Sequence, residues 1–594
     1  MRTLAARVQR RQLLERAETL RASGREAAAV GLIEHAVREN GGPPDDLVML
    51  ADWAASRGEP DKALDYLQQA LTLDRQHAGA RLARIEVLVA ANRLAEARDR
   101  LVHDVPQLAA GDINGRRRLA NSWAAVGELA TARTQLIALE RQQAEADPLL
   151  RRDTARLLRD SEPQQAIGLY RQAMLEAGLL AGADDAASMT AATRTDANDD
   201  WLARSLRSDL AELYQAQNPT LTLQHHFGWR NDDGTPGISE LKSNTTLLHL
   251  QWPGAGQRRF LRAERIDLNA GSLEADRQTG RGPDFGACRE TDGCDGKRQQ
   301  TDALMLAGGI GNDRLALDAG FSQGFEIDNL FGGLSANGDL GPLGWSLTAS
   351  RRPMSNSLLS FGGSVDPATD TRWGAVTANG ASLGLSVDEG GAHGVWANLG
   401  QHWLRGERVA DNQRFTGMAG YYYKWLDRVD ERLRTGLTYI HFSYERDLSG
   451  HTLGQGGYWS PQRYDSIGVP VSYAWRNAEW SILLEGGMGW AVSSSDDSRR
   501  YPLDELNARL PIISPQEARE VSEGSTSRGV SYRLQGLFER RLTDHFVLGG
   551  AFNWVYSEDY APSSALLFLR YHFAPWRGDL SWPVEPLQPY AEFR

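Results

Sequence analysis

The chain has 594 residues, of which 24% are charged, with a formal net charge of −12 and only two cysteines. This length is too great for one ordinary hydrophobic core and indicates two or more domains. Two cysteines exclude a disulfide-rich scaffold and a cysteine-rich metal centre, and the acidic balance argues against a general nucleic-acid binder. A mean hydropathy of −0.46, without any long apolar run, excludes a membrane protein built from many helices.

The composition changes near Pro219, which we interpret as a domain boundary. After residue 218 lie 48 of the 60 glycines and 14 of the 17 tryptophans. The first part is rich in Ala, Leu, Arg and Glu, which favour helices. The second part has glycines and aromatic residues in alternating runs, which favour strands and turns. The expected fold class is therefore α + β, with a helical domain followed by a β domain.

The first part contains a repeat of about 34 residues. A small residue recurs at intervals of 34, 34, 35 and 34 residues; a bulky residue follows it by four positions, and a turn-forming residue precedes it by five. The small residues are Ala29, Ala63, Ala97, Ala132 and Ala166, the bulky ones Ile33, Leu67, Leu101, Leu136 and Tyr170, and the turn residues Gly24, Gly58, Asn92, Gly127 and Ser161. A small residue lets two helices approach and a large one fills the groove a turn later, so the period predicts repeated helix pairs.

This helix–turn–helix period resembles the tetratricopeptide repeat. The best copy, residues 47–70, departs from the usual pattern at Ala51 and Ala54, which replace Gly and Tyr. The resemblance implies a solenoid over residues 1–182, in which each repeat buries its apolar face against its neighbours. An unrelated helical bundle with chance spacing is the alternative. Because the solenoid begins mid-repeat at Met1, we expect it to belong to a longer array.

Residues 183–218 are expected to form a loop and a capping helix. The segment 182–199 is rich in Ala, Asp and Thr without an apolar period, which favours a loop. Asp200 is placed to cap a helix that carries leucines at positions 202, 206, 210 and 213 on one face. We expect that helix to close the solenoid.

From Leu221 onward, segments of about ten residues alternate between apolar and polar positions, as transmembrane strands do. In residues 480–490, the apolar face begins at Trp480 and ends at Trp490, while Glu485 lies on the other face. Aromatic residues at the ends of an apolar face, with charge opposite, are typical of a transmembrane strand beside a wet lumen. One such strand alone would equally suit a soluble β-sandwich.

Sixteen strands are predicted, and their connections alternate in length. The strands start near residues 220, 243, 257, 301, 312, 327, 343, 372, 393, 413, 431, 464, 480, 527, 543 and 563. The long connections are 269–301, 352–372, 405–414, 447–464 and 493–527, and all fall on one side of the sheet. Bacterial outer-membrane barrels have short turns on one side and long external loops on the other. The pattern predicts an antiparallel transmembrane β-barrel of about 16 strands over residues 219–575, wide enough for an aqueous channel.

With an even number of strands, the chain enters and leaves the barrel on the same side, the side of the short turns. We therefore expect the barrel to lie in outer-membrane lipid, with the repeats and the C-terminal tail, residues 576–594, in the periplasm. The first twenty residues lack the apolar core and the cleavage site of a secretory signal. Since an outer-membrane barrel must first cross the inner membrane, we expect its precursor to carry a signal sequence upstream of Met1.

No motif supports catalysis, a cofactor or a metal ion. A G-x-S-x-G match includes Ser382, but this serine lies in strand-like alternation rather than at a strand-to-helix turn. The adjacent His225 and His226 point to opposite faces of a strand and cannot share a metal ion. Glu485 and Glu539 are expected to face the lumen as solvated charges, with a glycosidase pair as the alternative.

The two cysteines lie close together in the sequence. Cys288 and Cys294 both belong to the first long loop of the predicted barrel. In an external, oxidising location they are expected to form a small disulfide. Metal binding is less favoured, because no cluster of other ligands accompanies them.

Two loop segments carry distinctive motifs. Residues 358–367 (LLSFGGSVDP) lead to Trp373, and residues 454–462 (GQGGYWSPQ) lead to Tyr464. These segments resemble the C-terminal domain of bacterial cellulose synthase operon protein C, a family whose members export cellulose through the outer membrane. The resemblance covers the barrel half, and repeats ahead of a barrel fit its architecture. Trp459 stands where Phe or another aromatic residue is expected.

The resemblance implies that a growing β-1,4-glucan, the cellulose polymer, passes through the lumen. It also implies that the repeats contact the inner-membrane cellulose synthase complex or other periplasmic components. Aromatic rings can stack on the CH-rich faces of sugars. The candidate glucan contacts at the exit are Tyr458, Trp459, Tyr464, Phe361 and Trp373; packing within the loops is the alternative for each. Two other functions stay open: export of a poly-N-acetylglucosamine- or alginate-type polysaccharide, and a non-membrane scaffold.

Overall fold

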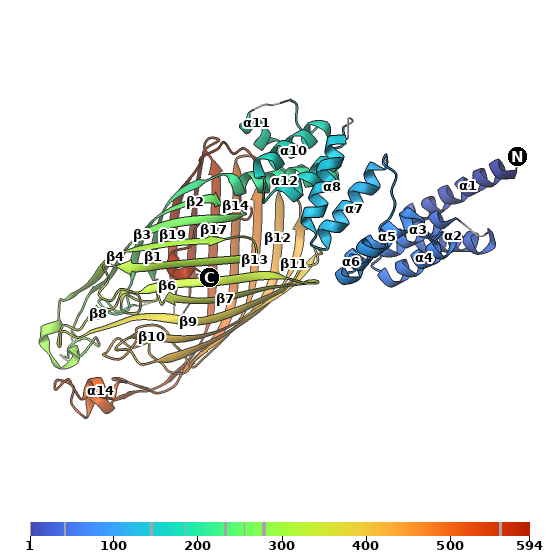
Figure 1. Ribbon diagram of the computed structural model, residues 1–594. Helices are drawn as coiled ribbons and strands as arrows, with labels where there is room; N and C mark the ends of the chain where they lie inside the picture. The colour runs from blue at the N-terminus through green and yellow to red at the C-terminus, as the bar shows by residue number, and fades with distance from the viewer. Residues whose placement is uncertain are drawn as a thin grey trace. The chain divides into compact units, whose positions relative to one another are not determined.

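The computed structural model contains two compact units, residues 1–182 and 183–594 (Figure 1). The residues whose placement it describes are 2–40, 43–142, 146–182, 185–230, 234–254, 256–275, 281–557 and 561–593. The helical array and the barrel fall in different units, so each has a core of its own.

The first unit consists of helices in consecutive pairs. In the described ranges they are α1 (Arg2–Ala22), α2 (Glu26–Asn40), α3 (Pro44–Ser56), α4 (Pro60–Leu73), α5 (Ala78–Ala90), α6 (Leu94–His103), α7 (Ile113–Ala125), α8 (Leu129–Gln142), α9 (Pro148–Leu158) and α10 (Pro163–Glu176). No helix in the described ranges is long and apolar enough to cross a membrane.

The repeated positions form the core of this unit, as their period predicts. All five small residues and all five bulky residues are buried. Gly58 and Asn92, which turn the chain between paired helices, have positive φ angles of 73° and 56°. Ion pairs such as Arg93–Asp61, at 3.3 Å, also join residues of neighbouring repeats. The predicted tetratricopeptide-like fold is confirmed.

Leu67 of α4 is fully buried in this core. We expect Leu67→Ala to lower the free energy of unfolding of the helical unit by about 2–5 kcal/mol, since it leaves a cavity between repeats. Thermal melting of the full chain, followed by circular dichroism of the helices, measures the change. Leu73→Ala, at a 57% exposed position at the end of the same helix, is the matched control. An equal loss in both variants would contradict the core position of Leu67.

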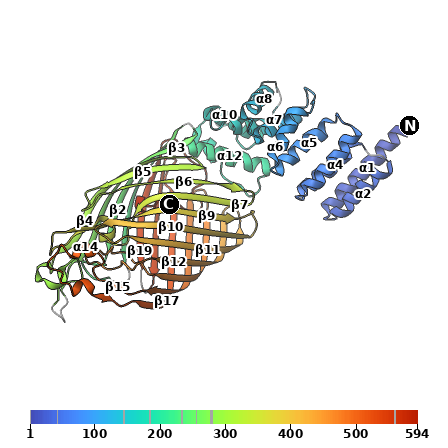
Figure 2. The same cartoon turned by 60° about the horizontal axis from the view of Figure 1, so that its bottom comes forward.

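The second unit contains a closed antiparallel barrel of sixteen strands (Figures 1 and 2). The strands are β1 (Thr220–Arg230), β2 (Lys242–Gly254), β3 (Gln257–Ser272), β4 (Arg298–Gly311), β5 (Leu315–Gln323), β6 (Leu330–Leu340), β7 (Leu343–Pro353), β9 (Arg372–Val387), β10 (His393–Glu407), β11 (Asn412–Asp427), β12 (Glu431–Tyr444), β13 (Arg463–Arg476), β14 (Trp480–Ser495), β17 (Ser525–Arg541), β18 (Phe546–Tyr556) and β19 (Pro562–His572). Because β1 pairs with both β2 and β19, the ring has no free edge. The predicted barrel and its strand number are confirmed.

Short structured segments occur in the loops of this unit. They are β8 (Ser364–Val365), β15 (Ser498–Arg499), β16 (Val521–Ser522), α13 (Leu358–Gly362) and α14 (Asp504–Asn507), together with short 3₁₀ turns. β8 pairs with the start of β9, and β15 pairs with β16. The long loops are therefore folded structures with their own backbone hydrogen bonds.

The connections differ in length between the two ends of the barrel. At one end, the turns from β2–β3 to β17–β18 contain two to five residues. At the other end lie the longest loops, residues 273–297, 354–371, 445–462 and 496–524. The expected long loop at 405–414 is only 408–411, because β10 and β11 stay paired as far as Leu404 and Asn412. β1 begins and β19 ends at the short-turn end, as predicted.

Side chains alternate between the two faces of the barrel wall. Leu484, Met488 and Trp490 of β14 are more than half exposed on the outside, whereas Glu539, on the opposite face of the neighbouring β17, is fully buried. Ser382 lies within β9 and pairs with Gly400, so it does not form a nucleophile elbow. The barrel therefore has an apolar outer face and a polar inner face.

Residues 185–218, which we call the neck, differ from expectation in two ways. The segment predicted to be a loop contains a short helix, α11 (Ala186–Ala191), capped by Asp185. Asp200 caps α12 (Trp201–Gln217) as predicted, but this helix falls in the same compact unit as the barrel. The leucine pattern identifies an apolar face; it does not determine which partner covers it.

Residues 576–594, expected to form a tail, are packed against other parts of the barrel unit over most of their length. Both views show the end of the chain inside the ring of strands (Figures 1 and 2). Residues 576–581 lie beside the neck, and Val584 and Tyr590 are buried against the inner face of the barrel. Burial of these apolar side chains, which a free tail would leave exposed to water, favours the inserted position.

Candidate functional site in the barrel lumen

The inner wall of the barrel carries charged residues that are paired with one another. Arg262 and Glu264, both on β3, lie 2.6 Å apart with almost no exposure. Arg352 of β7 pairs with Asp318 of β5 at 2.7 Å. Arg570 and Glu539 form a third pair at 3.2 Å. Because each buried arginine faces a carboxylate, these pairs add little net charge to the lumen.

The last described residues of the tail bind to the first two pairs. The Tyr590 amide donates to Glu264 at 2.8 Å, and its hydroxyl donates to Asp318 at 2.7 Å. Arg352 donates to the Phe593 carbonyl at 3.1 Å and lies 4.9 Å from the centre of the Tyr590 ring. The end of the tail is therefore attached to β3, β5 and β7.

The preceding part of the tail contacts strands farther round the ring. The Trp582 ring lies 4.5 Å from the Arg432 guanidinium and 4.8 Å from that of Arg476. Val584 packs with Ala474, Leu483 and Leu537 of β13, β14 and β17. The tail thus follows the inner wall from β12 and β13, past β1, to β7.

The inward positions of β9 to β11 lie outside this set of tail contacts. Most of them carry small or polar residues, together with Trp396 and Tyr422, on the face opposite the exposed leucines; Met418, His402 and Arg414 share this face. These residues include Gly380, Ser382, Gly384, Ser386, Trp396, Asn398, Gly400, Thr416 and Tyr422. Hydroxyl and amide groups can bond to sugar hydroxyls, and the rings offer stacking surfaces.

The long loops share a hydrophobic core at their end of the barrel. Trp373 is fully buried there and contacts Phe285 edge-on at 5.1 Å between ring centres. Tyr458 is 1% exposed, and its hydroxyl accepts a hydrogen bond from Asn412 at 3.1 Å; burial raises the pKa of Tyr458. Phe361 is also buried, against Phe325. In this structure these three candidate glucan contacts serve as loop packing.

The other two candidates form a more accessible cluster. Trp459 and Tyr464 are both partly exposed, and their ring centres lie 5.3 Å apart. Phe442 of β12 stacks on Tyr464 at 4.4 Å and contacts Trp459 at 5.4 Å. Phe442 was not among the residues predicted from the sequence. Strand alternation could have identified it, because Phe442 occupies an inward position near the end of β12, directly opposite Tyr464.

The loop core also contains the cysteines. Cys288 and Cys294 form a disulfide, with their Cα atoms 5.7 Å apart. Beside it, Asp366 accepts hydrogen bonds from the backbone amides of Ala287 and Ala368 at 3.2 Å. Burial raises the pKa of the Asp366 carboxyl. The bond from Ala287 joins loop 273–297 to loop 354–371.

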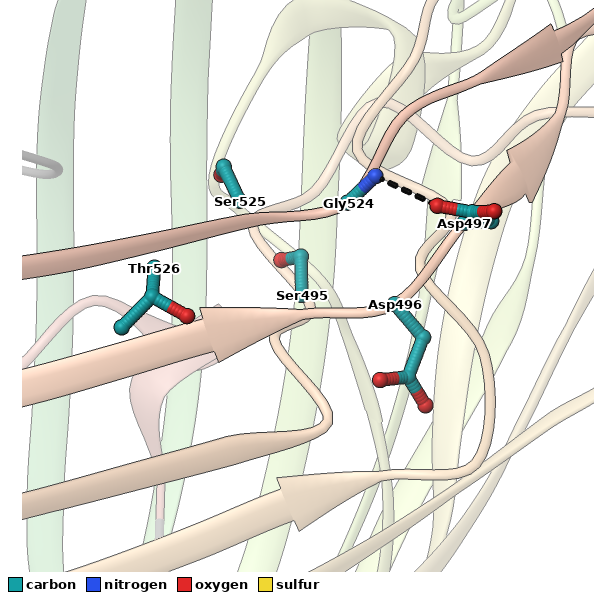
Figure 3. Close-up of a pocket in the computed structure, with 6 residues that line it drawn as sticks. All are labelled: Ser495, Asp496, Asp497, Gly524, Ser525 and Thr526. Atoms are coloured by element: carbon teal, nitrogen blue, oxygen red, sulfur yellow. Dashed lines mark hydrogen bonds between the residues drawn. The ribbon is translucent and has the colours of Figure 1, made fainter.

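The geometry offers no arrangement suited to catalysis among the residues considered above. Glu539 is neutralised by Arg570, and within the described ranges no three potential metal ligands gather. A polar hollow at the long-loop ends of β14 and β17 is lined by hydroxyl and carboxylate groups (Figure 3). There the Gly524 amide donates to Asp497 at 2.8 Å, which joins the two ends of loop 496–524.

The family described as "Cellulose synthase operon protein C C-terminus" matches residues 239–574, and a tetratricopeptide-repeat family matches residues 54–110. The chain belongs to the first of these families. Cellulose synthase operon protein C of Escherichia coli K12 is 38% identical over 606 residues, covering 99% of this chain and 51% of that protein. The Salmonella typhimurium protein of the same name is 37% identical, with 99% and 50% covered. The chain thus spans about half the length of these relatives.

Solved structures resemble parts of the chain more distantly. A "Bacterial polysaccharide outer membrane secretin" is 11% identical, covers 59% of this chain and 98% of its own, and has a TM-score of 0.37. The outer membrane channel DcaP of Acinetobacter baumannii is 11% identical, with 60% and 96% covered and a TM-score of 0.26. The barrel is established by the pairing of its own strands, which closes the ring.

Proposed function

We propose that the barrel lies in the outer membrane and exports nascent β-1,4-glucan, and that the repeats lie in the periplasm and link it to the inner-membrane cellulose synthase. The observation that carries the proposal is a closed sixteen-stranded barrel with a polar lumen in a chain of this family. In this proposal the chain performs no catalysis, and polymer synthesis supplies the driving force.

The paired charges favour a neutral polymer over a charged one. Export of an alginate-type polysaccharide would be helped by an excess of lumenal charge of the opposite sign. Instead, Arg262, Arg352 and Arg570 each face a carboxylate. The inward Ser, Thr, Asn and Gly residues of β9–β11 suit a chain that carries hydroxyl groups and no charge.

Deletion of residues 219–594 tests the proposal in cells. We expect cellulose to accumulate in the periplasm instead of outside, because the synthase would lose its route through the outer membrane. Cellulase-sensitive staining of intact and of permeabilised cells measures the two pools. Normal external cellulose would contradict the proposal, and accumulation of a different polymer would favour the other exopolysaccharide classes. Membrane fractionation of the intact chain tests the remaining alternative, a scaffold outside the membrane.

The cluster of Phe442, Trp459 and Tyr464 supports a glucan contact at the external exit. We expect Tyr464→Ala to slow cellulose secretion about threefold to tenfold, the effect of losing one stacking contact, while Tyr464→Phe retains most of the rate. Secreted cellulose per amount of protein in the outer membrane measures this change. Tyr439→Ala, on the outer face of β12, is the control; an equal loss there would show that the effect is general to the barrel.

A further inference from the structure

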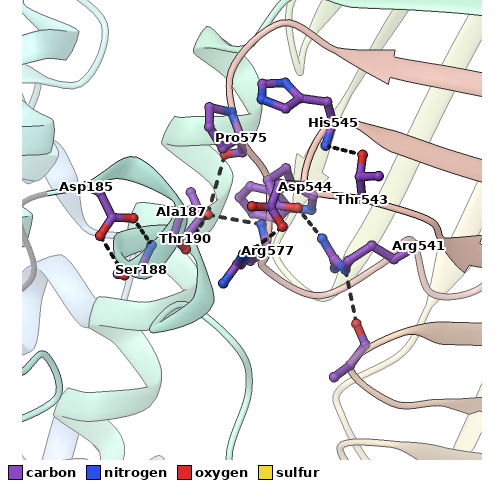
Figure 4. A network of polar contacts seen from close by, with 12 residues as sticks. Asp185, Ala187, Ser188, Thr190, Arg541, Thr543, Asp544, His545, Pro575 and Arg577 are labelled. Atoms are coloured by element: carbon purple, nitrogen blue, oxygen red, sulfur yellow. Dashed lines mark hydrogen bonds and ion pairs between the residues drawn. The ribbon is translucent and has the colours of Figure 1, made fainter.

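Residues 574–581, which join β19 to the rest of the tail, are held by the neck; we call this segment the tail root. Asn218 at the end of α12 exchanges two hydrogen bonds with Ala574: its amide group donates to the carbonyl at 2.9 Å, and its oxygen accepts from the backbone amide at 2.8 Å. Thr190 of α11 accepts from the Arg577 amide at 3.0 Å, and its hydroxyl donates to the Pro575 carbonyl at 3.5 Å. Both ends of the neck therefore bind the root, and Figure 4 shows the contacts of the Thr190 end.

The loop between the two neck helices adds further bonds. Thr195 donates to the Asp579 carboxylate through its backbone amide at 3.0 Å and through its hydroxyl at 2.6 Å. Arg194 donates to the Arg577 carbonyl at 2.7 Å. The Trp576 ring, only 3% exposed, stacks with Tyr214 of α12 at 6.1 Å.

The opposite side of the root is held by the turn between β17 and β18. Arg541 donates to the carbonyls of Trp576 and Gly578, and Arg577 pairs with Asp544 at 2.6 Å. These contacts place the root between the neck and the rim of the barrel (Figure 4). The root is thus fixed from two directions at the short-turn end.

Residues 582–593, the tail tip, continue directly from this root into the lumen. Twelve extended residues reach about 40 Å at most, so the position of the root limits which part of the wall the tip can meet. Trp582 and Val584 follow the root immediately and contact β12 to β17, whereas Tyr590 reaches β3 and β5. A shift of the root would displace Trp582 first and the rest of the tip after it.

We propose that the neck positions the tail: its hydrogen bonds to the root keep the tip in the lumen, and loss of these bonds or displacement of the neck releases the tip and widens the channel. This inference rests on the proposed function only in treating the lumen as a passage. It assigns Thr190, Thr195 and Asn218 as positioning residues, since none of them faces the lumen path.

Trimming of the C-terminus by carboxypeptidase, followed by intact-mass measurement of the purified full chain in detergent, tests the proposal. We expect the tip of the unaltered protein to resist trimming. The double variant Thr190→Val with Asn218→Ala is expected to be trimmed about tenfold faster or more, because it removes four neck–root hydrogen bonds. Asn477→Ala, which removes a turn-capping amide from another short turn, is the matched control.

Equal trimming of the double variant and the unaltered protein would overturn the inference, as would equal acceleration in the Asn477→Ala control. Heat-modifiable gel mobility shows that each variant retains its barrel; should the double variant fail to fold, Thr195→Val with Asp579→Asn takes its place. Since trimming requires no polymer transport, its result is independent of the cellulose secretion assay. A released tip with normal secretion would contradict control of the channel by the neck, while the export proposal would stand.

Discussion

Glu264→Ala is expected to destabilise the barrel by about 3–5 kcal/mol, because it leaves the Arg262 guanidinium buried without its carboxylate. The side chains of this pair are 0% and 1% exposed, so water cannot replace the lost partner. Glu264 also accepts the Tyr590 amide, and its loss should free the tail tip. Denaturant unfolding in detergent, followed by gel mobility, measures the stability, and carboxypeptidase trimming measures the release.

The matched variant removes both charges. Arg262→Leu with Glu264→Leu is expected to be clearly more stable than Glu264→Ala, since it buries no unpaired charge. Glu479→Ala, at an exposed turn position, controls for the loss of any carboxylate. If Glu264→Ala unfolds no more easily than Glu479→Ala, Arg262 and Glu264 do not form a buried ion pair in the lumen.

Trp373→Ala is expected to loosen the external loops while leaving the strands paired. The side chain is fully buried in the loop core and contacts Phe285, and removal of such a ring costs about 3–5 kcal/mol. Because the loops share this core, we expect loops 273–297 and 354–371 to become sensitive to protease together. Limited proteolysis in detergent, with the cleavage sites determined by mass spectrometry, measures the change.

Trp403→Ala, on the outer face of β10, is the control for this experiment. It should leave loop cleavage unchanged, because its ring is 48% exposed and lies outside the loop core. If the loops of Trp373→Ala resist protease as well as those of the unaltered protein, the hydrophobic loop core around Trp373 does not hold them in place. That result would restore Trp373 as a candidate contact for glucan.

Much of the fold follows from local patterns. The 34-residue period places Ala63 and Leu67 in the core between repeats, and both are buried. Strand alternation separates Trp490 from Glu485 on opposite faces, and the register agrees. Such patterns are visible in sequence because each depends on the period of one helix or strand.

The lumen and its contents depend on contacts between distant segments, and these are where prediction failed. The tail shows no regular period, so nothing local indicates that Tyr590 bonds to Glu264, 326 residues away in the sequence. An aromatic residue in a loop is equally suited to packing and to a ligand. For that reason Trp373 and Tyr458, which lie in the loop core, could not be told apart from Trp459 and Tyr464.

The sequence by itself determined the two-part architecture, the number and facing of the strands, and the end of the barrel that carries the long loops. It could do so because periodicity and turn chemistry act over a few residues. Only the tertiary structure decided that α12 belongs with the barrel, that the tail enters the lumen, and that most buried charges there are paired. These outcomes depend on which surfaces meet after the ring closes, since burial of a polar group is favourable only where a partner stands opposite it.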